Sequence, residues 1–127
     1  MTAGDPLAGG PVAGDASTGA VRRLGQVIGV RPERLQEYRQ LHAAPWPAVL
    51  ETLRRCHVRN YSIFYHAGLL FAYFEYTGDD WARDQARIAA DPATQAWWAR
   101  TDPCQQRLPD AAPGAQWSEL EPVFFMP

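Results

Sequence analysis

A tyrosine and a histidine stand four residues apart in the segment EYRQLHAAPWP, residues 37–47, just before two prolines. On a helix, this spacing brings Tyr38 and His42 onto one side. Imidazole titrates nearest to neutral pH of all side chains, which makes His42 a candidate for reversible proton transfer. The same pattern also fits a packed core histidine with a satisfied hydrogen bond. The segment therefore predicts either one wall of a pocket or a core face with two polar exceptions.

Aromatic residues supply the next candidates. Trp97 and Trp98 are adjacent, and neighbouring positions on a helix differ in direction by about 100°. We expect one indole to face a cleft, where an aromatic ring can pack against the C–H surface of a sugar. The alternative is one tryptophan in the core and the other over a helix edge. Tyr61 fits either cross-strand packing or a hydroxyl directed into a pocket.

The remaining histidines and the two cysteines have simpler explanations. His57 follows a predicted helix and His66 stands beside a predicted turn. Cys56 and Cys104 form no CxxC pair and are too few for a disulfide framework. Cys56 adjoins His57, but neighbouring side chains on a helix diverge, so the two make a poor chelate. We expect no metal site and no thiol nucleophile.

Composition excludes several classes of function. All 12 basic residues are arginine, and Schiff-base or pyridoxal phosphate chemistry needs a lysine amine. Neither GxGxxG nor GxxxxGK[ST] occurs, so the familiar nucleotide loops are absent. The formal charge is −2 with no basic stripe, which argues against nucleic acid. No apolar run approaches the roughly 20 residues of a membrane span. These features predict a cytoplasmic, soluble protein without pyridoxal phosphate or a familiar nucleotide-binding loop.

The elements that must position these residues belong to one domain. Residues 1–20 are small and glycine-rich, which predicts a disordered tail, and residues 21–127 form the expected domain. Asp79 or Asp80 and then Asp91 are expected helix caps. The expected strands cover 21–30, 59–66, 69–76 and 116–125, and the expected helices follow residues 31, 46, 79 and 91. This order predicts an α+β fold, a ferredoxin-like antiparallel sheet with helices on one face.

The hairpin strands predict a partner. They are apolar at nearly every position, with Tyr61, Ile63 and Tyr65 pointing one way and Ser62 and Phe64 the other. One helical layer covers only one face of a sheet, so the other face needs a cover. In a chain of 127 residues a second copy is the natural cover. We expect a homodimer through the sheet faces, a dimeric α+β barrel.

Four segments together resemble the L-rhamnose mutarotase family: EYRQLHAAPWPAVLETLRRC, RNYSIFYHAGLLFAYFEY, DPATQAWWAR and LEPVFFMP. The resemblance runs from about residue 23 to the end. It implies a dimeric α+β barrel that interconverts the α and β anomers of a free deoxy-sugar without a cofactor or metal. By this resemblance His42 matches the proton-transferring histidine, Tyr38 and Tyr61 match tyrosines that contact the sugar, and Trp97 with Trp98 match a tryptophan pair.

The chain departs from that family in three places. The 20-residue tail is extra, His57 stands where the family commonly has glycine, and the 101–116 segment diverges near the expected pocket. The last two leave the sugar preference open. The competing functions are a polyketide cyclase or cofactor-free monooxygenase of the same fold, and a non-catalytic sugar-binding module. A sugar site needs several hydroxyl partners beside the indoles, whereas a polyketide pocket would be longer and drier.

Overall fold

An antiparallel sheet of five strands forms one layer of the protein. The computed structural model describes residues 21–127, so the predicted tail over residues 1–20 lies outside the described residues. Within the sheet the order is β2-β3-β1-β4, with β5 also paired to β1. The strands are β1 (Arg22–Val30), β2 (Val58–His66), β3 (Leu69–Tyr76), β4 (Gln105–Gln106) and β5 (Ser118–Glu119).

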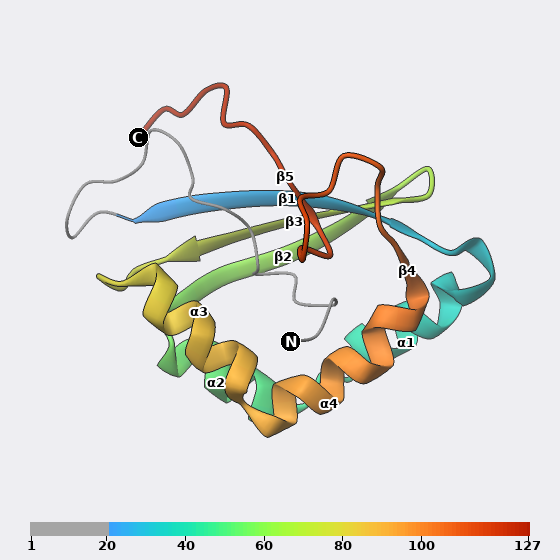
Figure 1. Cartoon of the computed structure of the whole chain (residues 1–127), viewed down its shortest axis with the longest axis horizontal. Coiled ribbons are helices and arrows are strands. Elements are labelled where there is room, and N and C mark those ends of the chain that lie inside the picture. Colours follow the sequence, from blue (N-terminus) through green and yellow to red (C-terminus); the bar gives the residue numbers. More distant parts are fainter. Residues whose placement is uncertain (1–20) are drawn as a thin grey trace.

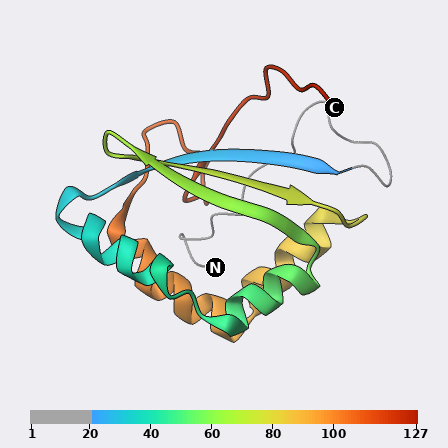
Figure 2. The ribbon, with the colours of Figure 1, turned by 180° about the vertical axis from the view of Figure 1, so that it is seen from behind.

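The helices form the second layer, on one face of this sheet. Figure 1 shows all four below the strands, and the view from behind in Figure 2 shows the same single layer. The α+β class with helices on one face is therefore confirmed. The α-helices are α1 (Leu35–Ala43), α2 (Pro47–Arg55), α3 (Trp81–Ala90) and α4 (Pro92–Thr101), with 3-10 turns at Pro32–Arg34 and Asp102–Cys104.

Local sequence explains where these helices begin. Asp80 caps α3, because its Oδ1 accepts a hydrogen bond from the backbone N–H of Arg83 at 3.1 Å. Asp91 caps α4 in the same way through the N–H of Thr94 at 2.9 Å, and proline occupies the first turn. The predicted caps are confirmed, with Asp80 rather than Asp79 in that role.

The hairpin of β2 and β3 turns at Ala67 and Gly68, whose φ angles are 50° and 85°. Positive φ at both positions matches the right-handed twist of the strands. A register shift between Arg59 and Ser62 interrupts β2, where Asn60 also has a positive φ of 50°. The hairpin was predicted from sequence, but this bulge was not.

The predicted last strand, residues 116–125, is wrong in length. Only Ser118–Glu119 pair with β1, and the backbone N–H of Leu120 adds one bond of 2.8 Å to the carbonyl of Gly25. Pro122 has no N–H to continue the ladder. After β5 the chain runs on the side of the sheet opposite the helices (Figure 1). There the exposed side chains of Val123–Met126 follow.

The segment that ends at about residue 115 was predicted to be a loop, but it contains the short strand β4, which pairs with Gly29 and Val30. A Cβ on Gly29 would lie 2.9 Å from the carbonyl oxygen of Gln106. Glycine therefore allows β4 to approach. Two residues are too few to show the alternation by which a strand is recognised in sequence.

Two core clusters fill the space between the layers. One contains Phe74, Trp97 and Trp98; the other contains Tyr38, Cys104 and Trp117. Tyr61 is partly buried and packs against both clusters. The junction between them lies between the helices and the inner face of the sheet, and the candidate site occupies that junction.

Candidate active site

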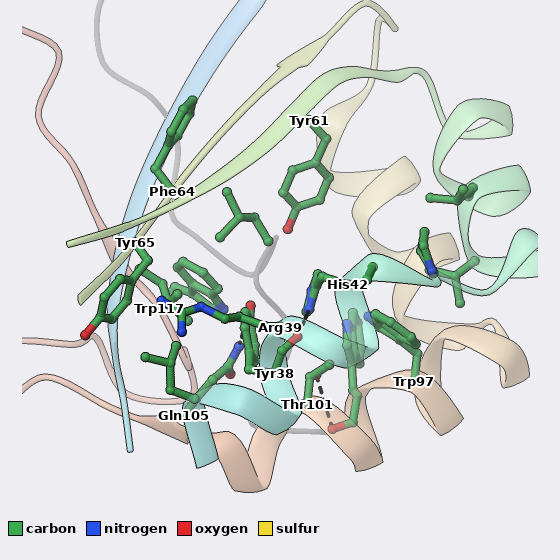
Figure 3. Close-up of a pocket in the computed structure, with 18 of the residues that line it drawn as sticks. Tyr38, Arg39, His42, Tyr61, Phe64, Tyr65, Trp97, Thr101, Gln105 and Trp117 are labelled. Atoms are coloured by element: carbon green, nitrogen blue, oxygen red, sulfur yellow. Dashed lines mark hydrogen bonds between the residues drawn. The ribbon is translucent and has the colours of Figure 1, made fainter. Parts of the chain in front are cut away.

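A cavity of about 560 Å³ lies between α1, α2 and α4 and the inner face of the sheet. Its volume is in the range typical of small-molecule sites, roughly 300–1,000 Å³. Most of its wall is aliphatic or aromatic. The side chains that could contact a polar ligand are shown in Figure 3 and are Tyr38, Arg39, His42, Tyr61, Tyr65, Trp97, Thr101, Gln105 and Trp117.

All five residues selected from the sequence contribute to this wall: Tyr38, His42, Tyr61, Trp97 and Trp98. They come from α1, β2 and α4, which are far apart in the chain. The structure therefore brings the candidates together around one space.

His42 stands in the last turn of α1 with one nitrogen already engaged. Its Nδ1 lies 2.9 Å from the backbone carbonyl oxygen of Tyr38. A carbonyl oxygen can only accept, so Nδ1 carries the hydrogen and Nε2 of the neutral ring keeps its lone pair. Burial lowers the pKa of His42 below its ordinary 6.5. The imidazole is therefore neutral at neutral pH and able to accept a proton at Nε2.

Two aromatic rings hold the His42 ring in place. It stacks on Tyr38 with ring centroids 4.2 Å apart and meets the edge of Trp97 at 5.3 Å. Trp97 is in turn packed against Trp46 at 5.2 Å. Because the imidazole stacks on Tyr38 and also contacts Trp97 in a T-shaped arrangement, the ring has little freedom to turn away from the cavity.

Tyr38 is buried, and that burial raises the pKa of its hydroxyl, which stays protonated. The hydroxyl oxygen accepts a hydrogen bond of 3.5 Å from Nε2 of Gln105. The Oε1 of Gln105 accepts from Nε2 of Gln116 at 3.3 Å. This chain of two amides fixes the direction of the Tyr38 hydroxyl.

Tyr61 faces this group from the sheet. It lies in the bulged part of β2, and Figure 3 shows its hydroxyl directed into the cavity toward His42. Of the two interpretations left open by the sequence, the structure supports a hydroxyl in a pocket, although the ring also packs on Phe74 at 5.3 Å.

The tryptophan pair does not divide between core and surface. Trp97 is 8% exposed and Trp98 is 3% exposed, and both belong to the same core cluster. Both also line the cavity. The expectation that only one would face a cleft is corrected: α4 lies so close to the cavity that adjacent residues both reach it.

Sequence reasoning missed the residues that the C-terminal part of the chain adds to the cavity. Gln105 is in β4, and Trp117 directly precedes β5. Thr101, at the end of α4, completes this part of the wall. The 101–116 segment was recognised as divergent, but only tertiary pairing shows that it reaches Tyr38. By contrast, His57 lies away from the cavity wall, 3.2 Å from Asp84.

Within residues 21–127, no group of three or more histidine, cysteine, aspartate or glutamate side chains is arranged to hold a metal ion. Among the helices of this range, none has the length and apolar character required to cross a membrane.

Comparison with known proteins shows the family. A family model described as L-rhamnose mutarotase matches residues 23–126. An L-rhamnose mutarotase from Bacillus subtilis (strain 168) is 30% identical over 108 residues, which cover 84% of this chain and 99% of that relative. Another from Mannheimia succiniciproducens is 34% identical over 106 residues, or 82% of this chain and 97% of the relative.

Solved structures agree on the fold. The crystal structure of an L-rhamnose mutarotase from Formosa agariphila superposes with a TM-score of 0.66 at 27% identity, over 84% of this chain and 99% of that one. Tetracenomycin F2 cyclase from Streptomyces glaucescens superposes with a TM-score of 0.59 at 16% identity, over 84% of this chain and 99% of that one. This second likeness concerns the fold alone. The fold is the dimeric α+β barrel fold, as predicted, and the chain belongs to the L-rhamnose mutarotase family.

Proposed function

We propose that the protein is an isomerase that interconverts the α and β anomers of L-rhamnose. The observation that carries this proposal is the neutral His42, whose Nδ1 is held by the Tyr38 carbonyl and whose ring lines a cavity beside Tyr61 and the tryptophan pair. Membership of the family supplies the substrate. Anomer exchange requires one proton removed and one delivered, and such an arrangement can do both.

Ring opening begins at the anomeric hydroxyl. Nε2 of His42 takes the proton of that hydroxyl, and the O–H electron pair forms the C1=O double bond. The C1–O5 bond breaks, and O5 takes its electron pair and receives a proton from the Tyr61 hydroxyl. The aldehyde end then rotates about C1–C2. Closure on the other face reverses each step, which returns one proton to Tyr61 and one from His42 to O1.

The rest of the wall holds the sugar. Trp97 and Trp98 provide apolar surface for its C–H groups, and Tyr38 provides a hydroxyl beside the imidazole. Thr101 and Gln105 add further polar groups. Several hydroxyl partners beside indoles favour a monosaccharide over a long, dry polyketide. A non-catalytic sugar-binding module would not need a proton acceptor at Nε2, and that feature favours an enzyme.

A homodimer through the outer sheet face forms part of this proposal. The helices cover one face, and on the other Phe64 is 64% exposed beside the half-buried Phe71. A second copy of the same face would remove this apolar surface from water. A cytoplasmic location is also proposed, supported by Cys56 and Cys104, which are both buried and unpaired.

Replacing the imidazole tests the function directly. His42→Ala removes the proton acceptor, and general acid–base help is worth about 10²- to 10⁴-fold in rate. We expect a loss of at least about 100-fold in anomer exchange of L-rhamnose, measured by NMR saturation transfer above the spontaneous rate. Gln40→Ala, on the exposed side of α1, is the matched control and should keep full activity.

Circular dichroism and size-exclusion chromatography must show that the His42→Ala protein is folded. A folded variant with wild-type exchange would remove His42 from the mechanism. A wild-type protein that binds L-rhamnose but does not accelerate exchange would support the binding-module alternative.

A further inference from the structure

Three of the residues that line the cavity carry buried hydrogen-bond donors, one residue on α1 and two in the stretch of chain that follows α4. They are Tyr38 with its hydroxyl, Gln105 with its amide and Trp117 with its indole N–H. All three side chains are buried, at 4%, 4% and 2% exposure. The mechanism proposed above uses none of them for proton transfer, so their arrangement needs its own explanation.

Trp117 is the most informative of the three. Its Nε1 is buried, and no residue in the described range 21–127 accepts its hydrogen. An indole nitrogen can only donate, and a buried donor without an acceptor costs stability. Phenylalanine would fill the same core position without that cost. Trp117 is one of the residues that line the cavity, so the partner that we infer for this N–H is an acceptor on a ligand bound closely enough to reach Nε1.

Gln105 is held so that it too donates. Its Oε1 is occupied by Nε2 of Gln116, which leaves the two N–H hydrogens of its own Nε2. One is directed to the Tyr38 oxygen at 3.5 Å. Because the Tyr38 oxygen accepts this bond, its own hydrogen remains to donate. The three groups thus form a set of donors and match a ligand that presents oxygen lone pairs.

The position of these donors relative to His42 determines which atoms of the sugar they contact. In the view of Figure 3, Gln105 and Trp117 lie on the opposite side of His42 from Trp97. Proton transfer places C1 and O5 of the sugar beside His42. In a six-membered ring the atoms across from the C1–O5 bond are C3 and C4, each of which carries a hydroxyl group in L-rhamnose.

We propose that Gln105 and Trp117, with Tyr38 held by Gln105, form a recognition site for the 3- and 4-hydroxyl oxygens of the sugar. This inference rests on the proposed function and extends it from chemistry to specificity. A site of buried donors penalises a ligand that lacks the matching oxygen, because the donors are then left unpaired. Gln105 and Trp117 would therefore determine which sugars are accepted.

The test combines variants with deoxy-sugars. Exchange rates are measured for L-rhamnose and for its 3-deoxy and 4-deoxy analogues with wild type, Gln105→Met and Trp117→Phe. Both substitutions keep an apolar shape close to the original and remove donors. The matched control is Gln106→Met, because Gln106 is the exposed neighbour of Gln105 in β4.

We expect each donor variant to lose about tenfold to a hundredfold in kcat/KM on L-rhamnose, the effect of one buried hydrogen bond. The wild type should lose a similar factor on at least one deoxy analogue. On that analogue the variant whose donor meets the missing hydroxyl should lose little more, since the bond it removes is already absent, while the other variant should lose its usual factor. Gln106→Met should match the wild type on every sugar.

Three results would overturn the inference while leaving the proposed function intact. One is a wild type that exchanges both deoxy sugars as fast as L-rhamnose, a measurement that needs no variant. Another is a kcat/KM for which the loss from the variant and the loss from the deoxy sugar multiply in every combination of variant and sugar. The third is full activity of both donor variants on L-rhamnose. A wild type without activity on L-rhamnose would overturn the proposed function and this inference together.

Discussion

At the scale of single residues, the contact between His42 Nδ1 and the Tyr38 carbonyl decides which nitrogen can take a proton. The donor and acceptor are four residues apart on α1. The spacing noticed in the sequence therefore has a second use: besides placing two side chains on one side of the helix, it lets the backbone select the tautomer. The free Nε2 and the lowered pKa then act together, because both favour a neutral ring that accepts a proton.

This arrangement predicts the pH dependence of the reaction. Burial lowers the pKa of His42 below 6.5, so Nε2 stays unprotonated further into the acidic range than an ordinary histidine. We expect kcat/KM to remain on its plateau as the pH falls through 6.5 and to decline only at lower pH. The measurement is anomer exchange across the acidic range, corrected for the buffer-catalysed rate. A half-maximal rate at or above 6.5 would contradict the assigned role.

The same lowered pKa has a consequence for folding. Between the folded pKa and 6.5, the unfolded chain binds more protons at this site than the folded chain. Stability therefore rises with pH through that window and declines as the pH falls below 6.5. The exchange measurements need a parallel unfolding curve at each pH, so that loss of rate is separated from loss of fold.

Residue types and spacing were sufficient to select His42, Tyr38, Tyr61 and the tryptophan pair as candidates. They could not select Gln105 and Trp117, because nothing local distinguishes these residues from other polar or aromatic positions. The contact of Gln105 with Tyr38 joins residues 67 positions apart. Such a contact depends on how β4 docks against β1.

At the scale of elements, the junction between α2 and β2 shows how a residue other than glycine is accommodated in a left-handed backbone conformation. His57 has a φ of 69°, the left-handed region that favours glycine. Its ring lies 3.2 Å from the buried Asp84, which also accepts a hydrogen bond from the Tyr76 hydroxyl. The contact of the His57 ring with Asp84 therefore stabilises the fold, whereas the left-handed backbone at His57 destabilises it.

Two substitutions at His57 separate these effects. His57→Gly loses the Asp84 contact but relieves the backbone, whereas His57→Ala loses the contact and keeps the strain. We expect the alanine variant to be less stable than the glycine variant by about 1 kcal/mol, measured by urea denaturation. The two proteins serve as controls for each other. Equal stability, or a more stable alanine variant, would show that the left-handed backbone is not strained.

Elements with local causes were predictable from sequence, and those with distant causes were not. The caps at Asp80 and Asp91 and the turn at Ala67-Gly68 depend on neighbouring residues, and all were identified. The bulge in β2, the short β4 and the early end of β5 depend on a partner strand. Tyr61 still lies on the side predicted from alternation with Ile63 and Tyr65, and all three residues line the cavity.

At the scale of the whole molecule, the outer face of the sheet connects the fold to its proposed assembly. Phe64 and Phe71 are paired across β2 and β3 on this face. Beyond β5, Val123 is 89% exposed and Phe124 is 84% exposed. Phe125 packs over the guanidinium of Arg23, with 3.3 Å from Cζ to the ring centroid. Apolar side chains on both the sheet and the C-terminal segment therefore favour one shared interface.

A charge placed in this face tests the dimer. Phe71→Arg would bury an unpaired guanidinium in the proposed interface, and we expect it to weaken association at least about tenfold. The readout is molar mass by light scattering over a dilution series. Ala86→Arg adds the same charge to the exposed side of α3 and should remain dimeric. A monomeric wild type, or a Phe71→Arg protein as dimeric as the wild type, would contradict the proposal.

The acid–base pair and the proposed recognition residues Gln105 and Trp117 come from separate stretches of chain, and this separation has an evolutionary consequence. His42 and Tyr61 come from α1 and β2, whereas Gln105 and Trp117 come from the stretch between the end of α4 and β5. That later stretch can vary while the acid–base pair stays in place. Under the roles proposed above, substitutions in this stretch alone would change which sugar the enzyme accepts during evolution. The proton transfer by His42 and Tyr61 would stay the same.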